Sequence, residues 1–260
     1  MTHPTLSRTS HRPWPLPRVP WILAQTWKDV LFVHYRVAKS RVRPLVPTVL
    51  DLEEYDGSAW VSIVAFDMTV RPRFLPPVPG LSFFPEINVR TYVRAGDKPG
   101  IWFFSLDAAN RLAAGGARAL LNLPYFVGKM SVRHRQGWVE YEHVRRGGEV
   151  AFEARYRGIG VPAEPVRGTL EHWLVERYCL YTVPLTGRLV REDIHHFPWP
   201  LASAEAEIEK NTLLAPFGIH PEDPPLLHYA ERQDVAVFPP LRARPRAGGV
   251  FSERGLLRAR

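Results

Sequence analysis

Polar side chains alternate with apolar ones along residues 84–93, and they include the acid and base types that active sites use. Every second position is polar, in the order Glu86, Asn88, Arg90 and Tyr92. Because successive side chains of a β-strand point to opposite faces, these four share one face. If that face lines an internal cavity, a carboxyl and a guanidinium group stand together inside the protein. In an open sheet the same pattern is a solvent face, and Glu86 and Arg90 form a structural ion pair.

The segment 117–130 places a rare lysine in an apolar stretch. A helix is predicted to end near Leu121, and Pro124 then forces an extended chain, so Tyr125 and Lys129 share a face of the next strand. Lys129 is one of only five lysines, beside 29 arginines. A lysine in apolar surroundings can have a lowered pKa and act as a nucleophile. The alternative is a lysine at the strand rim with its ammonium group in water.

Histidine and cysteine residues form no metal-binding pattern. His195 and His196 are adjacent on a predicted strand, so they point to opposite faces and cannot bind one metal together. His34 lies between apolar neighbours, which suits a buried structural histidine, the alternative being a catalyst. Cys179 is the only cysteine, so neither an intramolecular disulfide nor a cysteine-based zinc site is available. We therefore predict no metal, and the chain also lacks the glycine motifs of nucleotide-binding folds.

Strands must position most of these residues. Turn residues and alternation predict strands at 50–55, 59–68, 84–94, 100–106, 128–135, 138–145, 149–158, 178–183, 187–197, 204–210 and 226–238. Two helices are expected, one from an N-cap at Asp107 to about Leu121 and one from Thr169 to about Glu176. Many antiparallel strands with a few inserted helices predict an α+β fold around a curved or closed sheet.

Charge and proline divide the chain into three parts. Residues 1–20 and 241–260 together account for the whole net charge of +8, so residues 21–240 are neutral. We expect an extended Pro/Arg-rich arm over 1–20, a single domain over 21–240 and an Arg-rich tail over 241–260, with both ends solvated and weakly packed. A dedicated nucleic-acid domain would carry a basic face on its folded part, so no specific nucleic-acid partner is predicted.

The sequence contains no apolar run of the ~20 residues that a membrane span needs and no secretory signal pattern. We therefore expect a cytoplasmic protein.

A series of short motifs resembles one known family over about residues 25–240. It comprises Phe32-x-His34, Leu45-x-Pro47, Asp56-Gly57-x-Ala59-Trp60, Glu86-x-Asn88-x-Arg90-Thr91-Tyr92-Val93, Gly100-Ile101-Trp102-Phe103-Phe104-Ser105-Leu106-Asp107, Ala117-Arg118, Leu123-Pro124-Tyr125 and Leu170-Glu171-x-Trp173-Leu174-x-Glu176-Arg177-Tyr178. This series resembles the YqjF-like family of bacterial proteins, within the acetoacetate decarboxylase-like superfamily. The resemblance implies one α+β domain on a closed, cone-like antiparallel β-barrel with a central pocket.

The resemblance also bears on the chemistry. Decarboxylases of that superfamily carry a Pro-Lys-Lys pattern whose first lysine forms a Schiff base, whereas Tyr125 and Phe126 follow Pro124 here. With the barrel granted, Arg90 could bind a carboxylate with two hydrogen bonds, Asn88 could orient it and Glu86 could be a general acid or base.

We therefore predict a protein that binds a small carboxylate- or keto-bearing molecule at Asn88, Arg90 and Tyr125, without Schiff-base decarboxylation. The alternative is a cofactor-independent enzyme on a small organic acid, with Glu86 as acid/base and Arg90 as anchor. No cofactor is predicted, and a homo-oligomer is compatible with the sequence.

Overall fold

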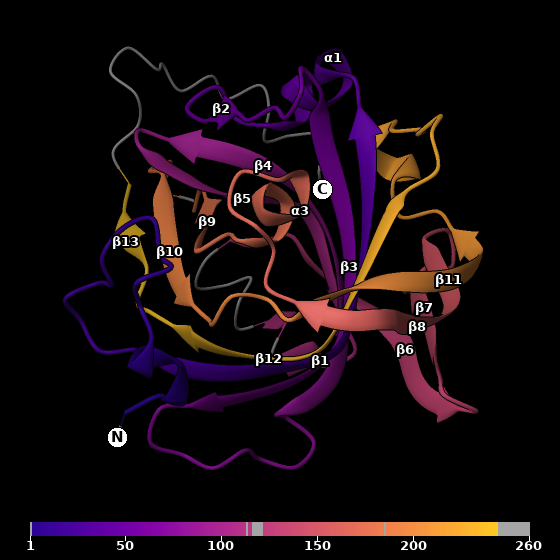
Figure 1. Cartoon of the computed structure of the whole chain (residues 1–260), viewed down its shortest axis with the longest axis horizontal. Helices are drawn as coiled ribbons and strands as arrows, with labels where there is room; N and C mark the ends of the chain where they lie inside the picture. The colour runs from indigo at the N-terminus through magenta and orange to yellow at the C-terminus, as the bar shows by residue number, and fades with distance from the viewer. Residues whose placement is uncertain (1, 113, 116–121, 185, 244–260) are drawn as a thin grey trace.

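The chain folds mainly as β-strands that join into one sheet (Figure 1). The computed structural model describes residues 2–112, 114–115, 122–184 and 186–243. The strands are β1 (Leu23–Val37), β2 (Asp51–Leu52), β3 (Ala59–Pro72), β4 (Phe83–Ala95), β5 (Lys98–Ala108), β6 (Tyr125–Arg135), β7 (Trp138–Arg145), β8 (Ala151–Ala163), β9 (Cys179–Thr182), β10 (Val190–His195), β11 (Leu201–Asn211), β12 (Leu226–Val237) and β13 (Leu241–Arg242).

The strand pairings close a ring. β12 pairs with β1, β1 with β3, β3 with β4, β4 with β5, β5 with β9, β9 with β10, and β10 with β12 again. A second path from β5 to β12 runs through β6, β7, β8 and β11. Most pairs are antiparallel, whereas β5 pairs in parallel with β6 and β9. The predicted mostly β architecture with few helices is confirmed.

Helical segments are short. They are α1 (Lys39–Val42), α3 (Leu170–Val175) and the 3-10 helices η1 (Pro4–Ser7), η2 (Arg43–Leu45) and η3 (Ala215–Phe217). Thr169 caps α3 as expected, because its hydroxyl accepts a hydrogen bond from the backbone N–H of His172. Figure 1 shows α3 in the middle of the ring. No helix in the described part of the chain is long and apolar enough to cross a membrane.

The central strands are buried on both faces. Ile63 and Val89 belong to one core, which extends to β7 and β8. Val64 and Tyr92 face the opposite core, which includes Leu174 of α3. β3 and β4 therefore separate two hydrophobic cores, and α3 packs on only one face of these strands.

The longest strand, β1, is missing from the predicted elements, and this omission is an error. Its second half, from Val30 to Val37, is buried on both faces apart from Arg36, so polar residues do not alternate with apolar ones there. Its first half carries Lys28 and then Asp29, which adopts a positive φ of 52° at an irregularity in the pairing with β3. A β-bulge of this kind breaks the two-residue period that sequence analysis uses.

Two predicted boundaries are also wrong. Asp107 is not a helix N-cap, because β5 continues to Ala108 and the Asp107 carboxylate accepts two hydrogen bonds of 2.7 Å from Arg145. Residues 111–112 and 114–115 are helical, and the rest of that predicted helix lies outside the described residues. Over 50–55 only two residues form a strand, and they pair with β4 rather than β3.

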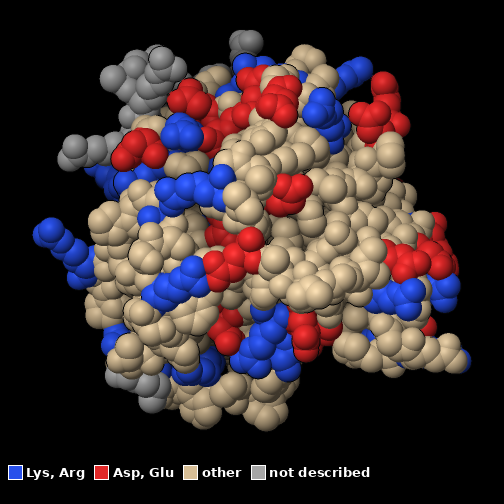
Figure 2. Space-filling view, in the orientation of Figure 1, with Lys and Arg blue, Asp and Glu red and all other residues tan. Residues whose placement is uncertain are grey.

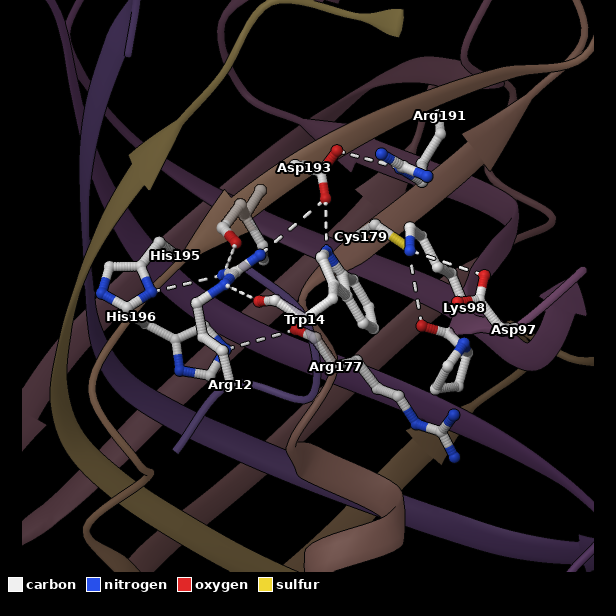
Figure 3. Close-up of polar contacts among 12 residues, drawn as sticks. Arg12, Trp14, Asp97, Lys98, Arg177, Cys179, Arg191, Asp193, His195 and His196 are labelled. Atoms are coloured by element: carbon white, nitrogen blue, oxygen red, sulfur yellow. Dashed lines mark hydrogen bonds and ion pairs between the residues drawn. The ribbon is translucent and has the colours of Figure 1, made fainter. Parts of the chain in front are cut away.

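The N-terminal arm is anchored to the sheet by a few buried residues, which corrects our expectation that residues 1–20 pack weakly, although most of its positions are exposed. Arg12 and Trp14 are buried against β10. The Arg12 guanidinium donates 2.6 Å to the Ile194 carbonyl and lies 3.8 Å from Asp193, while the indole N–H of Trp14 donates 2.9 Å to Asp193 (Figure 3). Apolar contacts add to this anchor, because Trp14 belongs to the larger core and Leu6 and Leu16 pack against the cluster around Trp21. Residues 244–260 of the predicted tail lie outside the described residues.

Charges on the surface are intermixed. On the face drawn in Figure 2, basic and acidic side chains lie beside each other instead of forming one basic surface. Pairs such as Arg155 with Glu207 and Arg157 with Glu205 join β8 and β11 in the same manner.

Candidate functional site

The polar face of β4 is buried. Glu86, Asn88 and Arg90 are only 4%, 4% and 6% exposed. They belong to the face that packs toward α3, because Tyr92, two residues further along, stacks on Trp173 of that helix with ring centroids 4.6 Å apart. The solvent-face interpretation is therefore wrong for this strand.

Glu86 is hydrogen-bonded to Tyr125, not to Arg90. The Tyr125 hydroxyl donates 2.9 Å to Oε2 of Glu86. The two residues meet because Tyr125 is in register with Leu106 on β5, which is in register with Asn88 on β4. The structure thus brings together Tyr125 and the polar face of β4, as the predicted site requires.

Burial controls the proton affinity of this pair. Loss of water raises the pKa of Glu86 to about 7, although hydrogen bonds from Tyr125 and Asn88 oppose the rise. Burial and the neighbouring Glu86 carboxyl likewise raise the pKa of Tyr125 well above its ordinary value. Glu86 can therefore exchange a proton near neutral pH, while Tyr125 stays protonated and acts as a hydrogen-bond donor.

Arg90 and Asn88 have buried polar atoms without a partner. Neither Nε of Arg90 nor Oδ1 of Asn88 has a hydrogen bond within the described residues. Burial lowers the pKa of Arg90, while Tyr92 favours its charged form. The guanidinium carbon also lies 5.7 Å from the centroid of the Phe32 ring. A donor and an acceptor are thus open to a ligand on the face that carries Glu86.

A histidine-centred cluster adjoins Arg90. Ser62 is in register with Arg90 and with His34, and its hydroxyl lies 2.6 Å from Nδ1 of His34 and 2.6 Å from the hydroxyl of Tyr92. Burial, followed by the charges of His228 and Arg90, places the pKa of His34 well below its ordinary value. His34 is therefore neutral, and its Nε2 atom has no partner among the described residues. The predicted apolar setting of His34 is confirmed, but its hydrogen bond with Ser62 was not foreseen.

Aromatic side chains form the rest of this face. Phe32 packs edge-on against Trp199 at 4.9 Å, and Trp27 stacks on Trp199 at 5.9 Å. The indole N–H groups of Trp60 and Trp199 are buried without a partner in the described part of the chain. The surroundings of Arg90 are thus apolar in bulk, with a few polar groups placed within them, as is typical of small-molecule sites.

All five lysines are described, and none is buried with this cluster. Lys129 is exposed, which confirms its interpretation as a rim residue. The other four are also exposed or only partly buried, namely Lys28, Lys39, Lys98 and Lys210.

Metal-binding geometry does not occur in the described residues, where no group of three or more His, Cys, Asp or Glu side chains lies together. His195 lies against the Arg12 guanidinium, whereas His196 lies near the backbone carbonyl of Arg177 (Figure 3). His195 donates to the carbonyl of Thr5 at 2.9 Å, while His196 stacks on Tyr178 at 4.6 Å. Both histidines hold backbone segments in place.

Sequence reasoning missed Ser62 and His228 altogether. Ser62 lies in an otherwise apolar run, where a single hydroxyl gives no signal by itself. His228 packs edge-on against His34 at 5.5 Å, although the two residues are far apart in the chain. Only the strand register, with Phe32 opposite His228 on β12, could have brought this pair together.

Comparison with known proteins places these residues in a wider context. The model of the DUF2071 family, described as an uncharacterized conserved protein, matches residues 24–234. The chain is 50% identical over 222 residues to the uncharacterized protein YqjF of Bacillus subtilis (strain 168), which covers 84% of this chain and 91% of that protein.

Solved structures share the fold at low identity. The enduracididine biosynthesis enzyme MppR, complexed with pyruvate, matches with a TM-score of 0.64 and 12% identity over 88% of this chain and 93% of that one. Acetoacetate decarboxylase from Legionella pneumophila matches with a TM-score of 0.60 and 11% identity over 91% and 94% of the two chains. The ring of strands is therefore an acetoacetate decarboxylase-like fold.

Proposed function

The chain belongs to the DUF2071 family of uncharacterized conserved proteins, and from this premise we propose that it binds a small carboxylate- or keto-bearing acid inside the ring of strands. Arg90 holds the carboxylate in this proposal, and Asn88, Glu86 and Tyr125 face the rest of the molecule, where the open Oδ1 of Asn88 can accept a hydrogen bond from a ligand donor. The ring is then the closed, cone-like barrel that the sequence motifs imply, with the ligand inside it.

The observation that carries the proposal is the buried guanidinium of Arg90, whose Nε has no hydrogen-bond partner within the described residues. A buried donor or acceptor without a partner costs roughly 1–3 kcal/mol, and more for a charged group. A ligand carboxylate would satisfy the guanidinium with charge-assisted hydrogen bonds and neutralise its charge.

The fold relatives support the same class of ligand. One neighbour in structure is complexed with pyruvate, a keto acid, and another is an acetoacetate decarboxylase. At 11–13% identity these proteins share the fold alone, so the argument for this chain depends on its own Arg90.

Schiff-base chemistry is not part of the proposal. The five lysines all lie outside the buried cluster, and the phenol of Tyr125 cannot form an imine. Borohydride treatment with acetoacetate should therefore leave the protein mass unchanged. A reduced adduct on Lys129, detected by peptide mass spectrometry, would revive the decarboxylase interpretation.

Calorimetric titration with pyruvate and with acetoacetate tests the binding proposal. The variant Arg90→Met keeps most of the side-chain volume but removes the charge, and we expect it to weaken binding about 10- to 100-fold. Arg133→Met, which changes an arginine on the outer end of β6 whose side chain is 63% exposed, is the matched control and should bind as the wild type does. Equal affinity of the Arg90→Met variant and the wild type would overturn the proposal.

The Glu86–Tyr125 pair favours a second candidate function, in which the bound acid also reacts. A carboxyl group with a pKa of about 7 can remove a proton from the carbon next to a ketone and return it. Pyruvate in D₂O would then exchange its methyl protons in the presence of the protein, and Glu86→Gln would abolish the exchange. Proton NMR follows this exchange. If pyruvate binds but its methyl protons do not exchange, the second function fails and only the binding function remains.

A further inference from the structure

Glu192 is a second buried carboxyl on the face that carries Arg90. The strand register shows this, because Glu192 is opposite Leu180 on β9, Leu180 pairs with Ile101 on β5, and Ile101 pairs with Tyr92 on β4. Paired residues of adjacent strands point to the same side of a sheet. Glu192 therefore faces the same interior as Tyr92 and, by alternation, Arg90.

The carboxyl of Glu192 has no partner. It is only 7% exposed, and no hydrogen bond or ion pair reaches it from any described residue. Glu192 also lies close enough to Tyr125 to act on it electrostatically. Its charge adds to that of Glu86 in raising the pKa of the Tyr125 hydroxyl. Burial and the adjacent Asp193 carboxylate raise the pKa of Glu192 to about 7.

Two basic groups near β10, Arg12 and Arg191, are engaged on the opposite face, and a third, Arg177, is paired with Glu53. Asp193 points to that face, where it contacts Arg12 and the indole N–H of Trp14 and accepts a 2.9 Å hydrogen bond from Arg191 (Figure 3). These groups cannot also reach Glu192, because neighbouring residues of a strand point in opposite directions. The interior face thus has an open guanidinium nitrogen on Arg90 and an open carboxyl on Glu192.

We propose that Glu192 receives a cationic nitrogen of the ligand, so that the ligand is a small acid that carries an ammonium group at the end distant from its carboxylate. This inference rests on the proposed function, because it places the carboxylate on Arg90. The two open groups have opposite charge, and a ligand with both charges satisfies both of them. A buried carboxyl without a donor is costly, and an ammonium group supplies three donors and the missing positive charge.

Matched pairs of ligands test this assignment. The series from 3-aminopropanoate to 6-aminohexanoate is titrated calorimetrically beside the unbranched alkanoates in which a methyl group replaces each ammonium group. We expect at least one amino acid of the series to bind tenfold or more tightly than its alkanoate partner. In Glu192→Gln this advantage should disappear, while the affinity for the alkanoate stays within about twofold. Glu205→Gln, at an exposed position of β11, is the control and should keep the advantage.

The outcomes separate this inference from the proposed function. If alkanoates and pyruvate bind in a manner that depends on Arg90 but no amino acid has an advantage, only the assignment of Glu192 fails. The assignment of Glu192 also fails if an amino acid still binds the Glu192→Gln variant more tightly than its alkanoate partner does. If no acid binds and Arg90→Met has no effect, the proposed function itself fails. A cooperative thermal melt of Glu192→Gln, at a temperature no lower than that of the wild type, shows that the variant is folded.

Discussion

Glu192 and Asp193 are neighbours on β10 and both are buried, yet their carboxyl groups have different surroundings. Asp193 contacts Arg12, Trp14 and Arg191. Glu192 has no hydrogen bond or ion pair within the described residues. A charge that holds the fold together is surrounded by partners, whereas a charge that lacks them is available for a ligand.

The same contrast recurs between β5 and β4. Asp107 accepts two hydrogen bonds of 2.7 Å from Arg145 and lies 3.2 Å from His143, so these basic groups hold the pKa of Asp107 below its ordinary value despite burial. Glu86 has no basic partner, and its pKa rises to about 7. The two carboxyls differ in their partners, and this difference separates a structural carboxylate from a candidate acid/base.

The largest effect should come from Asp193→Asn. The change keeps the shape of the side chain but leaves the buried guanidinium of Arg12 without its counter-charge. Breaking a buried pair in this way costs about 3 kcal/mol or more, and urea unfolding should show that loss. The same measurement on Glu192→Gln should show no loss, because no partner is abandoned. Equal losses in the two variants would contradict the contrast between the two carboxyls.

Strands were predicted best where one face of the strand is polar and the other is apolar. The hairpin of β4 and β5 and the meander of β6, β7 and β8 were predicted from alternation and turn residues, and both are confirmed. β1 was not predicted because both of its faces are buried over its second half, which removes the polar positions that mark a strand, and a bulge interrupts its first half. Apolar content alone does not distinguish such a strand from a buried helix.

The candidate site was only partly predictable, for a related reason. Glu86, Asn88 and Arg90 lie on one strand, so local alternation was enough to group them. Glu192 and His228 join that face through strand pairings between distant parts of the chain, and no local pattern encodes those pairings. Alternation alone did not decide whether these residues face the interior or the solvent, and the motif resemblance predicted the interior.

The next largest effect should be a pH dependence in Glu192→Gln. The pKa of Glu192 is about 7 in the folded protein and near 4.5 in the unfolded chain, so the folded state binds this proton more tightly. Ionising the carboxyl therefore reduces stability as the pH rises from 4.5 through 7. Relative to the wild type, the variant should gain roughly 3 kcal/mol between pH 4.5 and pH 8.5.

Urea unfolding at several pH values measures this difference. Glu205→Gln, at an exposed position, should follow the wild type at every pH. A flat difference between Glu192→Gln and the wild type would mean that the carboxyl has an unseen partner in the folded protein.

A smaller effect is expected in Tyr125→Phe, which removes the hydroxyl that donates a hydrogen bond to Glu86. A hydrogen bond to an ionised group contributes about 1.5 kcal/mol, so its loss should raise the pKa of Glu86 above its value of about 7. A carboxyl titration by ¹³C NMR follows this change directly. The carboxyl of Asp107, which keeps its basic partners, is the internal control, and a pKa of Glu86 that does not move would show that Tyr125 does not set it.

The smallest effect should come from the shortest ion pair of the N-terminal arm. Arg8 donates 2.5 Å and 2.9 Å to the two carboxylate oxygens of Glu164, a tighter geometry than the 3.8 Å between Arg12 and Asp193. Both partners of the outer pair are about half exposed, so water and salt screen their attraction in the folded chain. We therefore expect Arg8→Met to unfold in urea together with the wild type, whereas Arg12→Met should unfold earlier, because it leaves the buried Asp193 without Arg12. Repeating both titrations in 1 M salt sharpens the comparison, since only the outer pair is open to ions. If Arg8→Met lost as much stability as Arg12→Met, contact distance rather than burial would decide which charges hold this arm to β10.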